Sequence, residues 1–443
     1  MASPTNLRVL RLCSVFEPPP ESLRGRGARF DLIGGMQNHT ASLTRALDAF
    51  GVHQDVITTR PPGATAEQRL GARSTVHRLG LPVRAFRQFY SLPAAVLVDR
   101  LAPGADLLHV HLGEDLAIVP IALAAARRHK LPWVLTVHTS LAHTFAGTGS
   151  RGLVLKHAGG QLERAGVHRA DAVIALTARL AGLMERQGVP PSRIHVIPSG
   201  VVPVSSESPS RLVRSAGGKL APSSAPRSSV FGGPDPLVRD GRPRVLFVGR
   251  LAEQKGARYL VEAAPLMRTA DVDIVIVGDG PERGMLEDLT RRLRSQHRVR
   301  FAGFHPHDAI AEVLRGGDVL AMPSVYEELG SVLLEAMEAG LPIVASDTGG
   351  IRDAIGDAGV LVAPRDAAGL ARALDALLAD TDRRAEITAH ARERAKDFHW
   401  DRLAERVLGV YDSVLEGEAR EGDHRRGHKS SLTARNSVSS SSA

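Results

Sequence analysis

Short apolar runs alternate with longer helical segments along most of this chain of 443 residues. A strand that is buried on both faces reads as a continuous apolar run, and the helix that follows it shows a longer hydrophobic period. The alternation therefore predicts an α/β fold in which helices cover both faces of parallel, doubly wound, Rossmann-like sheets. It runs from residue 7 to 197 and resumes at residue 244, so we expect two such domains in tandem with a cleft between them.

Two segments interrupt or end this alternation. Residues 203–243 are dense in Ser, Pro, Gly and Arg and lack hydrophobic periodicity, which is typical of a linker or surface insertion. Residues 417–443 are charged and then Ser-rich, so we expect a disordered tail. The first domain then covers 1–202 and the second 244–397. The expected strands are 7–15, 52–58, 76–79, 106–111, 133–137, 172–176, 193–197, 244–248, 273–277, 299–302, 319–322 and 343–345, and the expected helices are 36–50, 86–101, 116–129, 143–169, 178–187, 257–267, 282–295, 309–315, 332–339, 352–356, 367–380 and 383–415.

The composition is that of a soluble globular protein, with 43% hydrophobic and 23% charged residues. The single cysteine, Cys13, lies in an apolar run and reads as a small buried hydrophobe, and no Cys/His spacing suits zinc. The amino terminus lacks the apolar core of a signal peptide. The longest apolar run, Leu116 to Ala126, is about half of the roughly 20 residues that a membrane span requires. We therefore expect a cytoplasmic protein.

Basic residues concentrate in the first half of the chain. Residues 1–200 hold 23 Lys and Arg against 13 Asp and Glu, a net charge of +10, and the remainder holds 33 against 35, a net charge of −2. This excess favours an anionic partner such as a phosphorylated substrate or an acidic lipid, although arginines that only solubilise the surface would give the same count. Nucleic acid is disfavoured because there is no zinc finger and no aromatic-studded basic strand.

One cluster in this half mixes basic and aromatic residues. Arg84 and Arg87 lie among Phe86, Phe89 and Tyr90. Such a mixture suits peripheral contact with the inner face of an anionic membrane, whereas aromatic rings that face the core would give only a basic surface loop.

Residues 318–351 predict a ligand site. An apolar strand is followed by a loop with Glu327, and a helix then opens at Gly330 and Ser331, with Glu335 in its first turns. Ligands bind at the carboxyl ends of strands in open α/β sheets, and a helix amino terminus there presents free N–H groups to an anion. A carboxylate beside a bound phosphate calls for hydroxyl donors, which a sugar supplies. The alternative is two solvated acids that the helix dipole favours.

Other residues follow the ends of other predicted strands. Arg250 and Lys255 follow strand 244–248, at the same edge as the Ser331 helix, and two cations beside a helix start suit a diphosphate. Gly34 and Gly35 occupy a strand-to-helix turn where backbone can approach a phosphate closely.

Seven stretches carry a family resemblance, which covers about residues 6 to 415. The chain resembles retaining glycosyltransferases of the GT-B fold, in the large family 4 that includes sucrose synthase and bacterial mannosyltransferases. In the GT-B fold two Rossmann-like domains face each other across a cleft. Three positions, Ser199, Glu328 and Leu329, depart from the family pattern. The matching stretches are GGMQNHTASLTRAL, TVHTS, VIPSG, VGRLAEQKG, IVGDGP, YEELGSVLLEAMEAG, which carries the E-x7-E signature, and FHWDRLAERVLGVY, which resembles a helix over 398–415 that crosses back to the first domain.

The resemblance implies roles for individual residues. Arg250 and Lys255 would bind the diphosphate of the donor, and Glu335 would hold the ribose. Glu327 would contact the transferred sugar and help to stabilise the transition state, and His138 would contact the donor sugar near the reacting carbon. The remaining donor-site residues would be Gly34, Gly35, Gly249, Gly303, Gly330, Ser331 and Val332.

The implied reaction moves a hexose-type sugar from a UDP- or GDP-sugar to an acceptor hydroxyl with retention of configuration. The sugar nucleotide is a co-substrate, and neither a metal nor another cofactor is expected. One alternative is an epimerase or hydrolase of nucleotide sugars on the same fold, and another is a non-catalytic protein that binds sugar nucleotides. A dinucleotide oxidoreductase is disfavoured because no G-x-G-x-x-G turn follows the first strand. The base, the sugar, the acceptor and the oligomeric state stay open.

Overall fold

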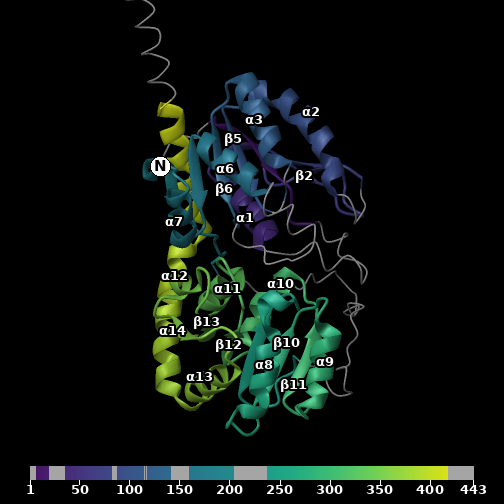
Figure 1. Cartoon of the computed structure of the whole chain (residues 1–443), viewed down its shortest axis with the longest axis vertical. Coiled ribbons are helices and arrows are strands. Elements are labelled where there is room, and N and C mark those ends of the chain that lie inside the picture. Colours follow the sequence, from purple (N-terminus) through teal and green to yellow (C-terminus); the bar gives the residue numbers. More distant parts are fainter. Residues whose placement is uncertain are drawn as a thin grey trace, which may run out of the picture.

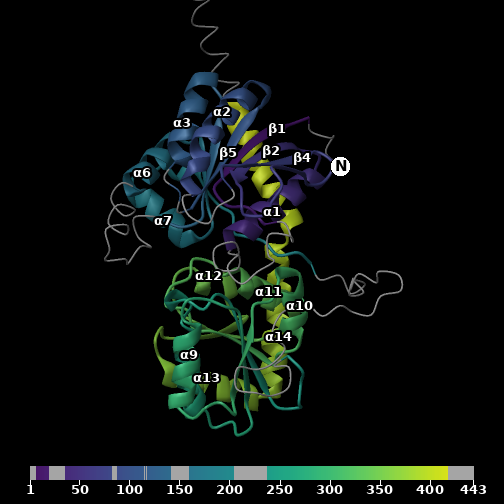
Figure 2. The same ribbon diagram turned by 90° about the vertical axis from the view of Figure 1, so that its right-hand side faces the viewer.

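The computed structural model describes residues 6–18, 35–81, 87–113, 115, 117–140, 159–203 and 237–417. Within these residues the chain forms two α/β halves that are stacked along the long axis of the molecule (Figure 1). The turned view shows the same two halves, with the last helices running along both (Figure 2). Gly34, Arg84, Phe86, most of the predicted linker and the tail from residue 418 lie outside the described residues.

The first half is built on an eight-stranded sheet in the order β3-β4-β2-β1-β5-β6-β7-β8. Neighbouring strands are parallel except for β3, which runs antiparallel to β4. Apolar side chains fill both faces of the central strands, as expected for a parallel sheet covered by helices. The strands are β1 (Arg8–Cys13), β2 (His53–Thr59), β3 (Glu67–Arg69), β4 (Ser74–Leu79), β5 (Leu107–Leu112), β6 (Trp133–Val137), β7 (Ala172–Ala175) and β8 (Ile194–Val196), and the helices are α1 (Gly35–Ala49), α2 (Ser91–Leu101), α3 (Ile118–His129), α6 (Gly160–Arg169) and α7 (Ala178–Arg186).

The second half is built on a six-stranded, fully parallel sheet in the order β11-β10-β9-β12-β13-β14. Two apolar clusters cover its two faces. The strands are β9 (Arg244–Val248), β10 (Asp273–Val277), β11 (Val299–Gly303), β12 (Val319–Met322), β13 (Ile343–Ser346) and β14 (Gly359–Val362), and the helices are α8 (Ala257–Ala263), α9 (Arg283–Arg292), α10 (His307–Arg315), α11 (Ser331–Ala339), α12 (Ile351–Ile355), α13 (Ala367–Ala379) and α14 (Thr381–Ala395).

The predicted doubly wound α/β class is confirmed, and the differences lie at sheet edges. The sequence reading missed β3, whose Glu-Gln-Arg sequence has no apolar residue, and β14, an edge strand whose residues are all half-buried. The predicted helix 143–169 appears as α6 from Gly160, and residues 143–158 lie outside the described part. The predicted helix 383–415 is interrupted at Lys396–Phe398 by a 3₁₀ turn.

The chain crosses back to the first half after this turn. A helix over 400–417 follows it. Its apolar face, which includes Trp400, Val407 and Tyr411, packs with residues of β1, β5 and α1. The crossing is fixed by backbone bonds at one place, where Val201 N donates to Phe398 O at 2.8 Å. The last helices therefore run along both halves (Figure 1).

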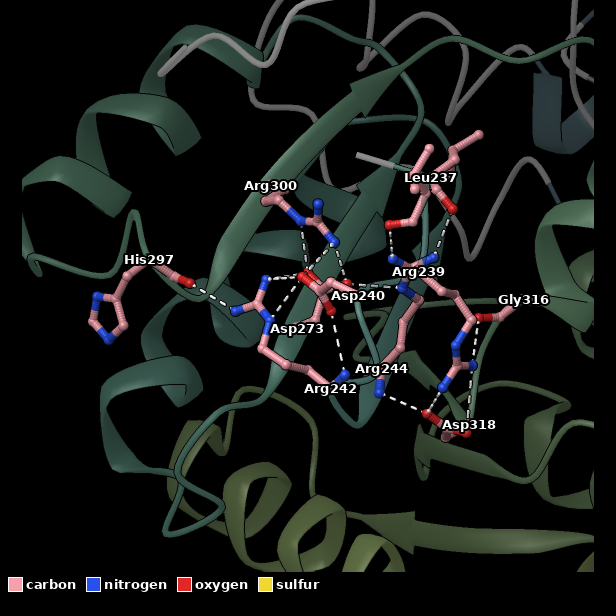
Figure 3. Close-up of polar contacts among 11 residues, drawn as sticks. Leu237, Arg239, Asp240, Arg242, Arg244, Asp273, His297, Arg300, Gly316 and Asp318 are labelled. Atoms are coloured by element: carbon pink, nitrogen blue, oxygen red, sulfur yellow. Dashed lines mark hydrogen bonds and ion pairs between the residues drawn. The ribbon is translucent and has the colours of Figure 1, made fainter. Parts of the chain in front are cut away.

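The last residues of the predicted linker contact the second half. Arg244, at the start of β9, donates to the carbonyl oxygens of Leu237 and Val238 at 2.9 and 2.8 Å. Its Nε also donates to the fully buried Asp273 at 2.8 Å, and Arg300 holds the other oxygen of Asp273 at 2.7 Å (Figure 3). This network lies at the amino ends of β9, β10 and β11, opposite the edge predicted to bind ligands.

Candidate active site

The loops after β9 and β12 meet at the carboxyl edge of the second sheet. Val325 N donates to Gln254 O at 2.8 Å, which joins the two loops. Lys255 Nζ forms an ion pair with Glu327 Oε2, and both side chains are largely buried. Arg250 lies exposed at the start of the β9 loop. The structure therefore brings Lys255 and Glu327 into contact, as their positions at neighbouring strand ends predicted.

Two glycines make the β12 loop possible. Gly330 adopts a left-handed conformation with φ of 75° immediately before α11, which a side chain would strain. Gly349 has φ of 59°, and a Cβ atom on it would lie only 1.6 Å from Glu327 O. Because the β13 loop can approach this closely, Gly350 N donates to Glu327 O at 3.2 Å and fixes the backbone of Glu327.

Glu335 lies in the second turn of α11, and its side chain is largely buried. Its side chain is 17% exposed. Burial raises the pKa of its carboxyl to about 8. The nearest cation-forming group is His307 Nδ1, 3.8 Å from Oε1. Burial also lowers the pKa of His307, so at pH 7 this neighbour is neutral and gives the carboxylate little charge support.

The first turns of α1 and α11 approach each other across the junction of the two halves (Figure 1). A Cβ atom built on Gly35, the first residue of α1, lies 4.0 Å from Ser331 Oγ, at the first residue of α11. One turn further along α1, Asn38 Nδ2 lies 3.3 Å from His307 Nδ1, the residue beside Glu335. Two helix amino termini thus converge beside Lys255 and Glu335, which gives the junction two sets of N–H donors.

Glu328 joins the two halves directly. It is 7% exposed, and its carboxylate accepts a hydrogen bond from Thr177 Oγ1 at 2.6 Å. Arg179 and Tyr326 bind its other oxygen, and Arg179 stacks 5.3 Å from the Tyr326 ring centre. Thr177 also caps α7 by accepting from Leu180 N. The sequence reading noted Glu328 only as a departure from the family pattern and missed this contact.

His138 follows β6 and faces a cluster of buried histidines. Its Nε2 lies 3.1 Å from His111 Nδ1, and its ring meets the ring of His39, from α1, edge to face at 4.6 Å between centres. His111 Nε2 in turn lies 2.6 Å from the guanidinium of Arg11. Burial lowers the pKa of His138 to about 3 and that of His111 well below its usual value, so both rings are neutral at pH 7.

The other predicted glycines and helix residues lie on the same sheet edge at different distances from this junction. Gly249 directly follows β9, and its N–H donates to Val277 O at 3.0 Å. Gly303 ends β11, where a side chain would meet Arg283 and not the Lys255 loop. Ser331 and Val332 are half-buried in the first turn of α11. Gly34 lies outside the described residues. The signals that could have pointed to Arg11 and His111 are a charged residue and a His-x-His pair inside otherwise apolar strands.

Two sequence profiles match the two halves. The profile described as "Glycosyl transferase 4-like domain" matches residues 34–200, and the one described as "Glycosyl transferases group 1" matches residues 234–394. Both matches place the chain in a class of proteins that transfer sugars.

Curated relatives extend along most of the chain. A 2-deoxystreptamine glucosyltransferase of Streptomyces kanamyceticus is 32% identical over 400 residues, which cover 86% of this chain and 99% of the relative. A 2-deoxystreptamine N-acetyl-D-glucosaminyltransferase of Streptomyces fradiae is also 32% identical, over 87% of this chain and 91% of its own length. The chain thus belongs to the GT-B glycosyltransferases of family 4, and it is a glycosyltransferase by homology.

Solved structures share the fold at low sequence identity. Sucrose-phosphate synthase from Thermosynechococcus elongatus superposes with a TM-score of 0.74 at 22% identity, over 93% of this chain and 100% of that one. Anabaena HepE in complex with UDP and glucose gives a TM-score of 0.65 at 18% identity, over 92% and 100%. These likenesses support the two Rossmann-like domains. Among the described helices, none is both long and apolar enough to cross a membrane.

Proposed function

We propose that this protein transfers a hexose-type sugar from a UDP- or GDP-sugar to an acceptor hydroxyl, with retention of configuration and without a metal. The observation that supports this most strongly is the convergence of the α1 and α11 amino termini beside Lys255, because N–H groups and a cation together suit a diphosphate. Relatives named as glucosyl- and N-acetylglucosaminyltransferases, and a fold neighbour solved with UDP and glucose, agree with such a donor.

The residues at the junction suit the separation of charge during transfer. Negative charge develops on the leaving diphosphate, where Lys255, Arg250 and the helix N–H groups would stabilise it. Lys255 now pairs with Glu327, so we expect the ammonium to turn to the phosphate when the donor binds and to leave the carboxylate for sugar hydroxyls. Glu335 would accept hydrogen bonds from the ribose. In this proposal the acceptor attacks the face from which the diphosphate departs, which retains the configuration.

The acceptor is proposed to be anionic. The first half carries a net charge of +10, which attracts phosphate and repels a cationic aminocyclitol. A relative from Salinispora tropica, 30% identical over 84% of this chain, is named for D-inositol 3-phosphate. A phosphorylated polyol therefore fits the charge of this chain better than 2-deoxystreptamine, which the names of the first relatives carry.

An acidic membrane surface is a second anionic partner that the basic first half would attract. Three large apolar side chains are exposed on α2 and the 3₁₀ turn before it, with Phe89 at 58%, Leu92 at 74% and Val96 at 64% exposure. Phe89 therefore does not face the core, whereas Tyr90 of the same cluster is buried and Phe86 lies outside the described residues. An enzyme of the cytoplasm with a loose, salt-sensitive hold on anionic lipid would use this surface.

The decisive experiment is a donor screen followed by an acceptor panel. The full-length protein is incubated with UDP- and GDP-sugars, and slow hydrolysis identifies the donor without knowledge of the acceptor. Inositol 3-phosphate, inositol and 2-deoxystreptamine are then compared at low and high salt, in EDTA, and the anomeric configuration of the product is determined. We expect transfer to the phosphorylated acceptor, weakened by salt and unaffected by EDTA. An inverted product, or activity abolished by EDTA and restored by Mn²⁺, would refute the proposal.

A further inference from the structure

Arg11 is a fully buried cation in the middle of the first sheet. It lies on β1, and its side chain is among the largest with no solvent exposure. One terminal nitrogen donates to Thr44 Oγ1 and Gln54 Oε1, and the other donates to His111 Nε2 at 2.6 Å. Within the described residues no carboxylate forms an ion pair with it. Because a buried charge without a counter-charge is costly, its bond to His111 calls for an explanation.

The direction of each hydrogen bond follows from the chemistry of the groups. A guanidinium has no acceptor, so Arg11 must donate and His111 Nε2 must accept. A neutral imidazole carries one proton, which in His111 therefore sits on Nδ1. That nitrogen lies 3.1 Å from His138 Nε2, so it donates to His138. His138 Nε2 accepts, and the proton of His138 sits on its Nδ1.

We propose that Arg11 and His111 are positioning residues that hold His138 in the neutral Nδ1–H tautomer, so that His138 offers a hydrogen-bond donor and not a base to the bound sugar nucleotide. No described residue bonds to His138 Nδ1, and 8% of the residue surface is exposed. The identity of the recipient, an oxygen of the donor, rests on the proposed function. The tautomer itself does not.

The lowered pKa values of both rings agree with this relay. Burial and the charge of Arg11 lower the pKa of His111 and of His138, the latter to about 3. His39 approaches His138 from α1, and its pKa is lowered in the same way. His109, on the other side of His111, is held separately by Tyr411 and Thr136. Cys13 lies further along β1, and burial raises its thiol pKa to about 11, so none of these groups supplies a negative charge at pH 7.

A metal ion is the competing explanation of the same cluster. One ring nitrogen from each of His39, His111 and His138 lies within 4.8 Å of the others, which could hold an ion. A metal-binding histidine normally donates its second ring nitrogen to a carboxylate or carbonyl. Here the second nitrogen of His111 faces a donor-only guanidinium, whose charge also repels a dication. The cluster therefore fits a hydrogen-bonded relay better than a metal site.

The tautomers can be read directly by NMR of the full-length protein labelled with ¹⁵N-histidine. Protonated and unprotonated ring nitrogens resonate in separate regions, and couplings to the ring C–H protons assign Nδ1 and Nε2. We expect His111 and His138 to carry their protons on Nδ1 at pH 7. A proton on Nε2 of His138, or a shift of both rings on addition of one equivalent of Zn²⁺ that His39→Ala abolishes, would overturn the relay. These results do not depend on whether the protein transfers sugar.

Variants at His111 separate the relay from general packing. His111→Asn keeps an N–H donor near the position of Nδ1, whereas His111→Leu has a similar size and no donor. His109→Leu is the matched control, since it removes a neighbouring buried histidine outside the relay. Arg11→Met would also break the bonds to Thr44 and Gln54, so it is less informative.

The expected result is a change of tautomer and of turnover that follows the donor. In His111→Leu the His138 proton should redistribute to Nε2, and kcat should fall by about ten- to a hundredfold, as for loss of one oriented donor. His111→Asn should retain the Nδ1–H tautomer and a kcat within a few-fold of wild type. An unchanged His138 tautomer in His111→Leu, or equal losses of kcat in all three variants, would contradict a positioning role. If the tautomers are as expected but no sugar nucleotide is turned over, the proposed function fails and the relay stands.

Discussion

Glu335 is expected to bind a proton in the free protein and to release it when the donor binds. Its pKa is raised to about 8 because the carboxylate is desolvated, and neutral His307 does not compensate. At pH 7 about nine in ten molecules therefore carry a protonated Glu335. A ribose diol would favour the ionised form, because two hydroxyl donors replace the lost water.

The size of the effect follows from the pKa. At pH 7 ionisation lies one unit below the pKa and costs about 1.4 kcal/mol, a factor of about ten in affinity. The dissociation constant of the nucleotide sugar should therefore fall roughly tenfold between pH 7 and pH 9. The free protein should become less stable over the same rise in pH. An acid with a raised folded pKa contributes stability that is present below its unfolded pKa, near 4.5, and is lost as pH rises through about 8.

Calorimetry at several pH values tests this coupling. A nucleotide sugar is used, since its diphosphate does not titrate in this range, and two buffers of different ionisation enthalpy give the number of protons released. We expect nearly one proton at pH 7 and none above pH 9. Glu335→Gln should bind with little pH dependence, while Glu338→Gln, on the same helix but bonded to His399, should behave as wild type. No proton release in the wild-type protein, or an unchanged pH profile in Glu335→Gln, would refute the reasoning.

Four further predictions concern single features. Lys255→Ala should lower transfer about a hundredfold while the protein stays folded, since one oriented charge at a developing anion is worth roughly 3 kcal/mol; steady-state kinetics with near-wild-type rates would contradict this. Glu328→Gln and Arg179→Met should show a coupling of about 1 kcal/mol in donor affinity in a double-mutant cycle, because their ion pair joins the two halves. Additive effects on donor affinity would show that this ion pair does not contribute to donor binding. Chemical unfolding should show that stability falls as pH drops below about 6.5, by up to roughly 1.4 kcal/mol per pH unit for each buried neutral histidine. The reason is that a histidine whose folded pKa is depressed contributes stability above its unfolded pKa, and this stability is lost as pH falls towards the folded pKa. A flat profile down to pH 5 is the opposing result. Leu92→Ser with Val96→Ser should reduce co-sedimentation with phosphatidylglycerol vesicles at low salt, and equally weak wild-type binding to anionic and neutral vesicles would leave a soluble acceptor.

Local sequence patterns predicted the parts of the fold in which burial dominates. The central strands are apolar runs because helices cover both faces, so their order along the chain was readable. The strand β3 was not, since Glu-Gln-Arg gains its place only from antiparallel pairing with β4. The same holds for Arg239, which the low-complexity composition assigned to a linker and which bonds to Asp318 at the start of β12. Contacts between distant segments decided both cases.

The same division applies to the site. Lys255 and Glu327 could be placed together from sequence because the carboxyl ends of parallel strands share one edge of a sheet. The relay to His138 could not, since it requires the strand order β1-β5-β6: only then does Arg11 lie opposite the His-x-His strand and His111 lie beside the end of β6. Adjacent strands in a doubly wound sheet need not be consecutive in the chain, so 100 residues separate the guanidinium from its histidine. The side chains proposed to bind the donor thus follow strand ends, and sequence patterns place them at one edge of the sheet. The groups proposed to fix the tautomer of His138 lie on neighbouring strands, and only the folded sheet brings them together.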